Sequence, residues 1–126
     1  MRKVWIIDDD QDMVGAIRLM VKMLEYEERH FFSARLAAQT LLGGEYPDLF
    51  ILDINMPEVS GLDFLEFLRR RNDWNDLGVV MLSTEAADVM VDKAMAIGAD
   101  AYVTKPVALE ELEKAMKKAL TAHGKQ

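Results

Sequence analysis

The sequence contains no cysteine and only two histidines, His30 and His123. Disulfide bonds and thiolate metal sites are therefore excluded, and a bound metal ion would have to be held mainly by oxygen atoms. The sequence also lacks a run of about 18 apolar residues and an N-terminal leader in which basic residues precede an apolar stretch. We therefore expect a soluble, cytoplasmic protein that does not associate with a membrane.

Basic residues are too few to suggest binding to nucleic acid. The 15 Lys and Arg residues stand against 22 Asp and Glu residues, which gives a formal net charge of −7. Affinity for DNA or RNA comes chiefly from Lys and Arg on phosphates, so we expect protein partners and no nucleic-acid binding by this domain alone. A chain of 126 residues is long enough for one compact domain and too short for two, so residues 1–126 are expected to form one domain.

Short apolar runs alternate with longer amphipathic stretches along the whole chain. The predicted strands are residues 4–7, 30–32, 49–52, 79–82 and 101–103. The predicted helices are residues 11–25, 34–42, 61–71, 86–97 and 108–120. Most of these strands are apolar throughout, which is typical of a parallel sheet covered by helices on both faces. The pattern therefore predicts an α/β fold with a doubly wound, five-stranded parallel sheet and five helices.

Polar side chains gather where the predicted strands end. The first strand is followed by Asp8, Asp9 and Asp10, the third by Asp53, the fourth by Ser83 and Thr84, and the fifth by Thr104 and Lys105. Ligands of open parallel sheets bind beyond the carboxyl ends of the strands, where the winding direction switches. We therefore expect one cluster of three or four carboxylates with hydroxyls and one ammonium.

Carboxylates gathered in this way repel one another. Two of them about 5 Å apart repel by roughly 3 kcal/mol at an effective dielectric of about 20, and a divalent cation relieves the conflict. Mg²⁺ prefers oxygen ligands and is usually bound by one or two carboxylates together with phosphate oxygens. An Asp carboxylate is a known phosphoryl acceptor, and Lys105 with Ser83 or Thr84 could supply positive charge and hydrogen-bond donors. The sequence thus predicts a joint site for Mg²⁺ and phosphate.

Four segments together resemble the motifs of bacterial response-regulator receiver domains. They are residues 6–10 (IIDDD), 52–57 (LDINMP, with Gly61), 81–84 (MLST) and 102–106 (YVTKP). The resemblance covers essentially the whole chain, and four motifs in the right order are far more specific than any one alone. It implies a flavodoxin-like sheet with strand order 2-1-3-4-5.

The resemblance also implies a function in two-component signalling. A sensor histidine kinase or a histidine phosphotransfer protein would donate a phosphoryl group, and Asp53 matches the residue that accepts it. Ser83 matches the switch hydroxyl, Thr84 a residue that contacts the phosphoryl group, and Lys105 the lysine of the family. Tyr102 matches the aromatic residue whose ring turns when the hydroxyl moves. The face formed by the fourth helix, fifth strand and fifth helix would then signal to a downstream protein or an output domain.

The same resemblance implies how the metal ion is held. Asp9 and Asp53 match direct ligands of Mg²⁺, Asn55 would add its backbone carbonyl, and Asp8 would act through a water molecule. The peptide bond before Pro106 matches one that is cis in the family. Such a domain is no enzyme beyond its own phosphorylation and dephosphorylation, and it is a monomer or a phosphorylation-dependent dimer.

Two other functions compete with this interpretation. A small Mg²⁺-dependent phosphatase of the haloacid-dehalogenase kind would use Asp8 as nucleophile and Asp10 as acid and base. Asp12, however, stands where Thr or Val is expected in that family, and the chain has no room for a substrate-capping domain. A purely structural interaction module that never receives phosphate is disfavoured by the complete set of acids, hydroxyl and lysine.

The predicted first helix has more apolar surface than one core stripe requires. Beside the stripe lies a second apolar row, formed by Met13, Ala16, Met20 and Met23. The row is either part of a broad buried face or a Met-rich docking surface for a kinase or phosphotransfer helix, and we favour docking. His30 and His123 are expected to be surface residues, and neither is assigned a role.

Overall fold

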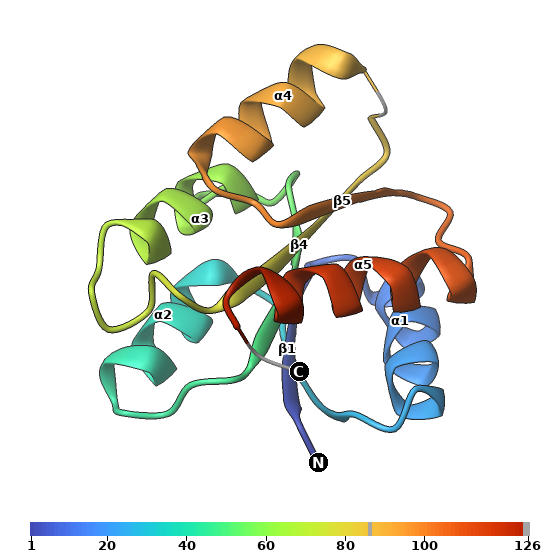
Figure 1. The fold of residues 1–126 in the computed structure, drawn as a ribbon, viewed down its shortest axis with the longest axis horizontal. Helices are drawn as coiled ribbons and strands as arrows, with labels where there is room; N and C mark the ends of the chain where they lie inside the picture. The colour runs from blue at the N-terminus through green and yellow to red at the C-terminus, as the bar shows by residue number, and fades with distance from the viewer. Residues whose placement is uncertain (86, 125–126) are drawn as a thin grey trace.

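The computed structural model describes residues 1–85 and 87–124, which form five strands alternating with five helices (Figure 1). The strands are β1 (Lys3–Ile7), β2 (Glu27–Phe31), β3 (Leu49–Asp53), β4 (Gly78–Ser83) and β5 (Ala101–Thr104). The helices are α1 (Gln11–Met23), α2 (Ala34–Leu42), α3 (Gly61–Arg69), α4 (Asp88–Ile97) and α5 (Leu109–Ala122). All pairings are parallel and the strand order is β2-β1-β3-β4-β5, so the predicted fold class and strand order are confirmed. Within the described ranges, no helix is long and apolar enough to cross a membrane.

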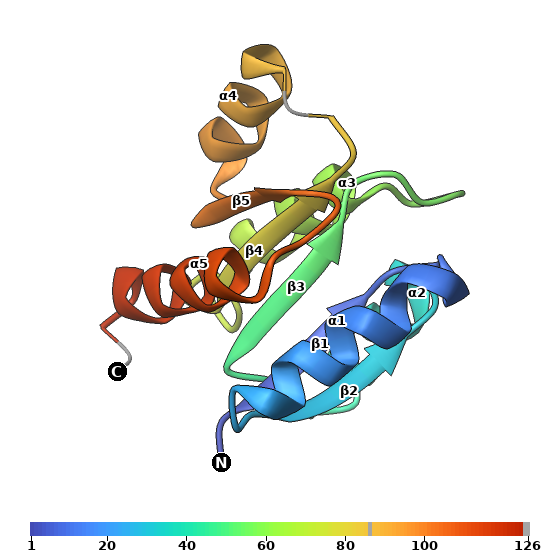
Figure 2. The ribbon, with the colours of Figure 1, turned by 90° about the vertical axis from the view of Figure 1, so that its right-hand side faces the viewer.

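The sheet carries a hydrophobic core on each face. Successive strand residues point to opposite faces, so Phe50 and Leu52 pack with α2, α3 and α4, whereas Leu49 and Ile51 pack with α1 and α5. Figure 2 shows α1 and α5 in front of the strands, with α2 and α3 partly hidden behind them. Because both faces are covered, β3 and β4 are buried along their whole length. Burial on both faces explains why the sequences of these two strands are apolar almost without interruption.

Side-chain caps fix where the first three helices begin. The Asp10 carboxylate accepts hydrogen bonds from the backbone N–H groups of Asp12 (3.0 Å) and Met13 (3.3 Å) at the start of α1. Ser33 caps α2, and Ser60 begins α3 with a capping box. These contacts satisfy backbone donors that have no partner inside the helix, and they set the ends of the loops that follow β1, β2 and β3.

Several element boundaries differ from those expected. Helix α1 ends at Met23, not Glu25, because Glu25 has a left-handed backbone conformation with φ of 67°. Helix α3 ends at Arg69, and α5 runs from Leu109 to Ala122. The expected start of the fourth helix, Ala86, lies outside the described residues, and α4 begins at Asp88.

Strand β2 departs most from the expectation, because it begins three residues earlier and is largely polar. It lies at the edge of the sheet and pairs with β1 alone. The Glu28 side chain is only 4% exposed, and its carboxylate accepts from Arg18 of α1 (Nη2–Oε1 2.9 Å) with Lys22 Nζ at 3.5 Å. The buried charge on β2 is thus neutralised by α1, which apolar periodicity cannot reveal.

The expectation that His123 is a surface residue is wrong. His123 follows α5, is half-buried, and places Nε2 3.0 Å from both carboxylate oxygens of Asp100. Asp100 also accepts from Arg69 Nη2 (3.0 Å) and from the backbone N–H of Val79 (2.8 Å). Arg69 Nε in turn donates to the carbonyl of Gly98, the C-cap of α4, at 2.9 Å. We call Arg69, Asp100 and His123 the basal cluster; it joins the ends of α3, α4 and α5.

Candidate functional site

The pairing of the strands brings the polar residues that follow them to one edge of the sheet. Ile7 of β1 lies beside Leu52 of β3, Asp53 beside Leu82 of β4, and Ser83 beside Thr104 of β5. The carboxyl ends of four neighbouring strands are therefore level with one another. The residues that end or follow these strands meet there, as expected from the sequence.

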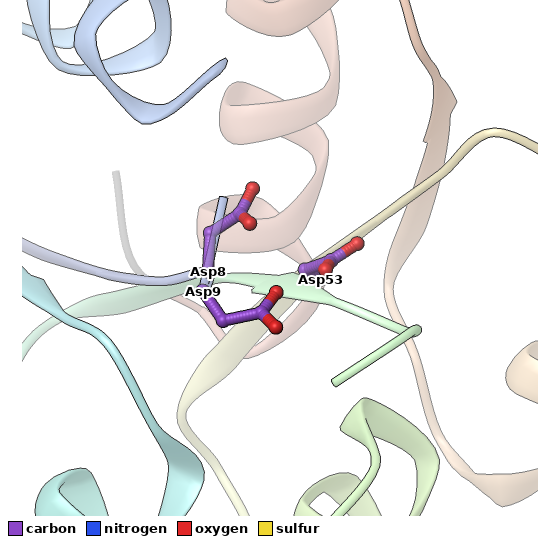
Figure 3. A group of neighbouring side chains, drawn as sticks. All are labelled: Asp8, Asp9 and Asp53. Atoms are coloured by element: carbon purple, nitrogen blue, oxygen red, sulfur yellow. The ribbon is translucent and has the colours of Figure 1, made fainter. Parts of the chain in front are cut away.

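Three aspartates form the centre of this site. One carboxylate oxygen from each of Asp8, Asp9 and Asp53 lies within 4.8 Å of the others. Figure 3 shows them at adjoining strand ends, with Asp8 and Asp9 consecutive after β1 and Asp53 beside them. Asp8 is fully buried, Asp53 is 4% exposed, and Asp9 is exposed. The group thus has a buried wall and an open side.

Lys105 brings the positive charge of the site. Its ammonium lies 3.2 Å from an oxygen of Asp8 and 3.4 Å from an oxygen of Asp53, and its side chain is only 8% exposed. The Lys105 backbone N–H donates to the carbonyl of Ser83 at 2.8 Å, which fixes the loop after β5 against the end of β4. The preceding strand and this contact hold the lysine between the two buried acids.

The site contains more negative charge than Lys105 neutralises. Burial raises the pKa of Asp53 to about 6 from an ordinary value of 3.8, and repulsion from Asp8 adds to the rise, while Lys105 opposes it. Burial lowers the pKa of Lys105, but Asp8 and Asp53 raise it by more, so that the net pKa lies above its ordinary value. A second cation at the open side would relieve the repulsion among the acids.

The other expected site residues surround this centre. Ser83 is fully buried, and its hydroxyl accepts a hydrogen bond from the backbone N–H of Glu85 at 3.0 Å. The Tyr102 hydroxyl donates to the backbone carbonyl of the same Glu85 at 2.7 Å. Thr84 directly follows β4, Asn55 lies two residues beyond the end of β3, and both are exposed. Two expected switch residues, Ser83 and Tyr102, therefore meet at Glu85, a residue that was not singled out in the sequence.

Two backbone features shape the loops around the centre. Gly61 donates its backbone N–H to the carbonyl of Ile54 at 2.9 Å, and a Cβ at this position would collide with the carbonyl oxygen of Asp53 and lie 2.8 Å from Ile54 Cα. The close approach of α3 to the end of β3 thus requires glycine. The bond between Lys105 and Pro106 is cis, the isomer that the resemblance implied.

The expectation that His30 is a surface residue is also wrong. The ring is half-buried, and Nε2 lies 2.8 Å from the backbone carbonyl oxygen of Asp8. The contact depends on the pairing of His30 with Ile6 across β2 and β1. No signal in the sequence reveals that register, because β2 lacks the apolar pattern that would fix it.

The second apolar row of α1 divides into two parts. Met20 is half-buried and packs against the core, and Met13 is half-buried as well. Met23 is 60% exposed, as is Leu19, and Ala16 is exposed. The two half-buried methionines fit the broad buried face, whereas docking at the exposed members of the row, with Leu19 beside them, stays a prediction.

Known proteins resemble this chain in both sequence and fold. The model of the response regulator receiver domain family matches residues 4–117. The chain belongs to this family. The receiver domain is 34% identical to the transcriptional regulatory protein BasR of Escherichia coli over 126 residues, which cover 98% of the chain and 54% of BasR. It is 32% identical to KdpE of the same organism, with 98% and 53% covered.

Among solved structures, the receiver domain resembles the chemotaxis protein CheY4 of Vibrio cholerae, with a TM-score of 0.85 and 26% identity over 95% of this chain and 99% of that one. The receiver domain spans about half the length of BasR and KdpE. The phosphatase interpretation is not favoured by these relatives. The Asp10 carboxylate, which that interpretation needs as acid and base, caps α1 instead.

Proposed function

We propose that this receiver domain accepts a phosphoryl group on Asp53 from a phosphohistidine of a sensor kinase or phosphotransfer protein, with Mg²⁺ as cofactor. The observation that carries the proposal is the placement of a nearly buried Asp53 carboxylate within reach of Asp8, Asp9 and the ammonium of Lys105. We further propose that residues 1–126 form one domain, that this domain acts in the cytoplasm, and that it is no enzyme towards other substrates. We also propose that the domain alone binds neither nucleic acid nor membrane.

The acids fit a hard divalent cation. The donor set consists of oxygen atoms and has an open side at Asp9. Burial, together with repulsion from the neighbouring acids, already raises the pKa of Asp53. We assign Asp9, Asp53 and the backbone carbonyl of Asn55 as direct ligands, and Asp8 as a ligand through water. When bound, Mg²⁺ supplies positive charge to the phosphoryl oxygens.

The transfer itself requires little from the protein besides position and charge. An oxygen of ionised Asp53 forms a bond to phosphorus while the bond between phosphorus and the donor's imidazole nitrogen breaks, and the electron pair stays on that nitrogen. Because the pKa of Asp53 is about 6, the carboxylate is largely ionised at neutral pH and able to attack. Lys105 neutralises charge on the phosphoryl group and keeps Asp8 as its second partner.

The switch begins at Ser83. To bind a phosphoryl oxygen, its hydroxyl turns towards Asp53 and gives up the 3.0 Å hydrogen bond from Glu85, while the Thr84 backbone N–H also binds the group. The carbonyl of Glu85 holds the Tyr102 hydroxyl, so release of the loop frees the tyrosine. A shift from 1:99 to 99:1 takes about 5.5 kcal/mol, within reach of several charge-assisted hydrogen bonds. The face of α4, β5 and α5 would then bind a downstream protein or output domain, or a second copy.

Phosphorylation by acetyl phosphate tests the proposal without a partner. The protein is incubated with acetyl phosphate and Mg²⁺, and intact-mass spectrometry measures the gain of one phosphoryl group. We expect labelling of the wild type, none of Asp53→Asn, and none of any sample in which EDTA replaces Mg²⁺. Labelling of Asp53→Asn that disappears in Asp8→Asn would contradict the proposal and favour the phosphatase chemistry.

A further inference from the structure

We propose that His30 is a positioning residue for the acid pair Asp8 and Asp9, and that its imidazole raises the affinity of the site for Mg²⁺ by fixing the peptide bond between them. The inference rests on the proposed function, in which these acids hold the metal ion. His30 comes from the edge strand β2, which contributes no carboxylate or lysine to the site.

The peptide groups on both sides of Asp8 are held by β2. The backbone N–H of Asp8 donates to the carbonyl of Phe31 at 3.1 Å, and the carbonyl oxygen of Asp8 lies 2.8 Å from Nε2 of His30. A carbonyl oxygen can only accept, so Nε2 carries the hydrogen and donates it. The side chain of Asp8 is fixed as well, because Oδ1 accepts from the N–H of Asp10 at 2.9 Å and Oδ2 lies 3.2 Å from the ammonium of Lys105.

The imidazole is itself held in place. Its ring centroid lies 4.2 Å from that of Phe32 at an interplanar angle of 74°, an edge-to-face arrangement. The strand that carries it is paired with β1 from Lys3 to Ile7, and His30 lies opposite Ile6. The donor atom is therefore delivered to the Asp8 carbonyl by a half-buried ring on a paired strand.

This contact bears most directly on Asp9. The carbonyl that His30 binds belongs to the peptide bond joining Asp8 to Asp9, so a rotation of that bond would redirect the Asp9 side chain. Asp9 is the exposed member of the three acids, whereas Asp8 and Asp53 are buried and bonded to Lys105. The position of the Asp9 carboxylate thus depends more on its backbone than the positions of the Asp8 and Asp53 carboxylates do. Residues that orient metal ligands without touching the ion typically change metal affinity by 10- to 100-fold when replaced.

The test uses two substitutions at His30 and calorimetric titration with MgCl₂. His30→Phe keeps an aromatic ring but removes the donor, and we expect the Kd for Mg²⁺ to rise about 10-fold. His30→Gln replaces the ring but keeps an N–H donor, and we expect it to restore most of the affinity. His123→Phe is the matched control, because it removes the other histidine, also half-buried and hydrogen-bonded, from the opposite end of the sheet. Its Kd should equal that of the wild type.

An unchanged Kd in His30→Phe overturns the inference, and so does an equal rise in His30→Phe, His30→Gln and His123→Phe, which would reflect lost stability alone. A second measurement needs no variant. With two histidines in the chain, the ¹⁵N spectrum of the imidazoles can be assigned, and a hydrogen on Nε2 of His30 supports the inference whereas a bare Nε2 overturns it. Failure of the proposed function differs from both results, because the wild type would then neither bind Mg²⁺ nor be labelled by acetyl phosphate.

Discussion

Replacement of Asp53 by Asn should stabilise the metal-free protein, although it removes the residue on which the proposed chemistry depends. The carboxylate is nearly buried among Asp8 and Asp9, and burial with their repulsion raises its pKa to about 6, which means that the folded state disfavours its ionised form. An amide of the same shape carries no charge and avoids this cost. Lys105 keeps its contact with Asp8 in the variant.

The size and pH dependence follow from linkage. Below pH 3.8 the carboxyl is protonated in both states and the variant gains nothing; as pH rises, the unfolded chain loses its proton first and the wild type is progressively weakened until the folded pKa of about 6 is passed. One pKa unit corresponds to about 1.36 kcal/mol, so the rise amounts to about 3 kcal/mol. The advantage of Asp53→Asn in the free energy of unfolding should therefore be near zero below pH 4 and about 3 kcal/mol above pH 7.

Urea unfolding in EDTA between pH 4 and pH 8 measures this difference. Asp73→Asn is the control, because that carboxylate is exposed and its replacement should change stability by less than about 0.5 kcal/mol at every pH. Mg²⁺ should then reduce the difference in the free energy of unfolding between Asp53→Asn and the wild type. An ion at 100 times its Kd adds about 2.7 kcal/mol to the free energy of unfolding of the wild type, and it adds less to that of a variant lacking a ligand. An advantage that is the same at pH 4 and pH 8, or a variant less stable at pH 8, would refute the electrostatic reasoning.

Two further predictions concern the loop after β3 and the exposed face of α1. Gly61→Ala should lower the free energy of unfolding by about 1–3 kcal/mol, because the new Cβ collides with the backbone at Asp53; urea unfolding measures it, with Gly15→Ala, where a Cβ meets nothing within 4 Å, as control. The double variant Leu19→Glu and Met23→Glu should slow phosphotransfer from a histidine donor about 10-fold, because docking of the donor would bury a carboxylate at a cost of more than about 1.4 kcal/mol. Labelling by acetyl phosphate, which needs no docking, should stay unchanged. Equal losses in both reactions would contradict a docking role for these residues.

The fold was predictable where burial leaves a simple pattern in the sequence. Strands β3 and β4 are covered on both faces, so their unbroken apolar runs located them to within a residue at each end. Strand β2 was misplaced because an edge strand has one neighbour and tolerates charge, and Glu28 is neutralised by a helix rather than by its own strand. The end of α1 was missed because only the backbone conformation of Glu25 marks it.

The centre of the site was predictable because the carboxyl ends of parallel strands meet, whatever lies between them in the sequence. The acids at 8, 9 and 53 and the lysine at 105 needed only that rule and the family motifs to be brought together. His30 and His123 were not predictable, because each contacts a residue whose position depends on strand register or on the length of the last helix. Contacts of this kind follow from tertiary packing and leave no periodic signal.

The basal cluster determines how α4 can move. Arg69 donates a hydrogen bond to the carbonyl of Gly98, the C-cap of that helix, and Asp100 and His123 link the arginine to the end of α5. Ala94 is the buried residue of α4, and Met90 and Ile97 are partly buried against the same core, so the helix buries less of its surface than α3 or α5 does. With its C-terminal end held by Arg69, α4 can pivot about that end more easily than it can slide along the sheet. Because Glu85 precedes α4 and Arg69 binds its other end, a displacement of the loop at Glu85 would move the first turn of the helix more than its last turn.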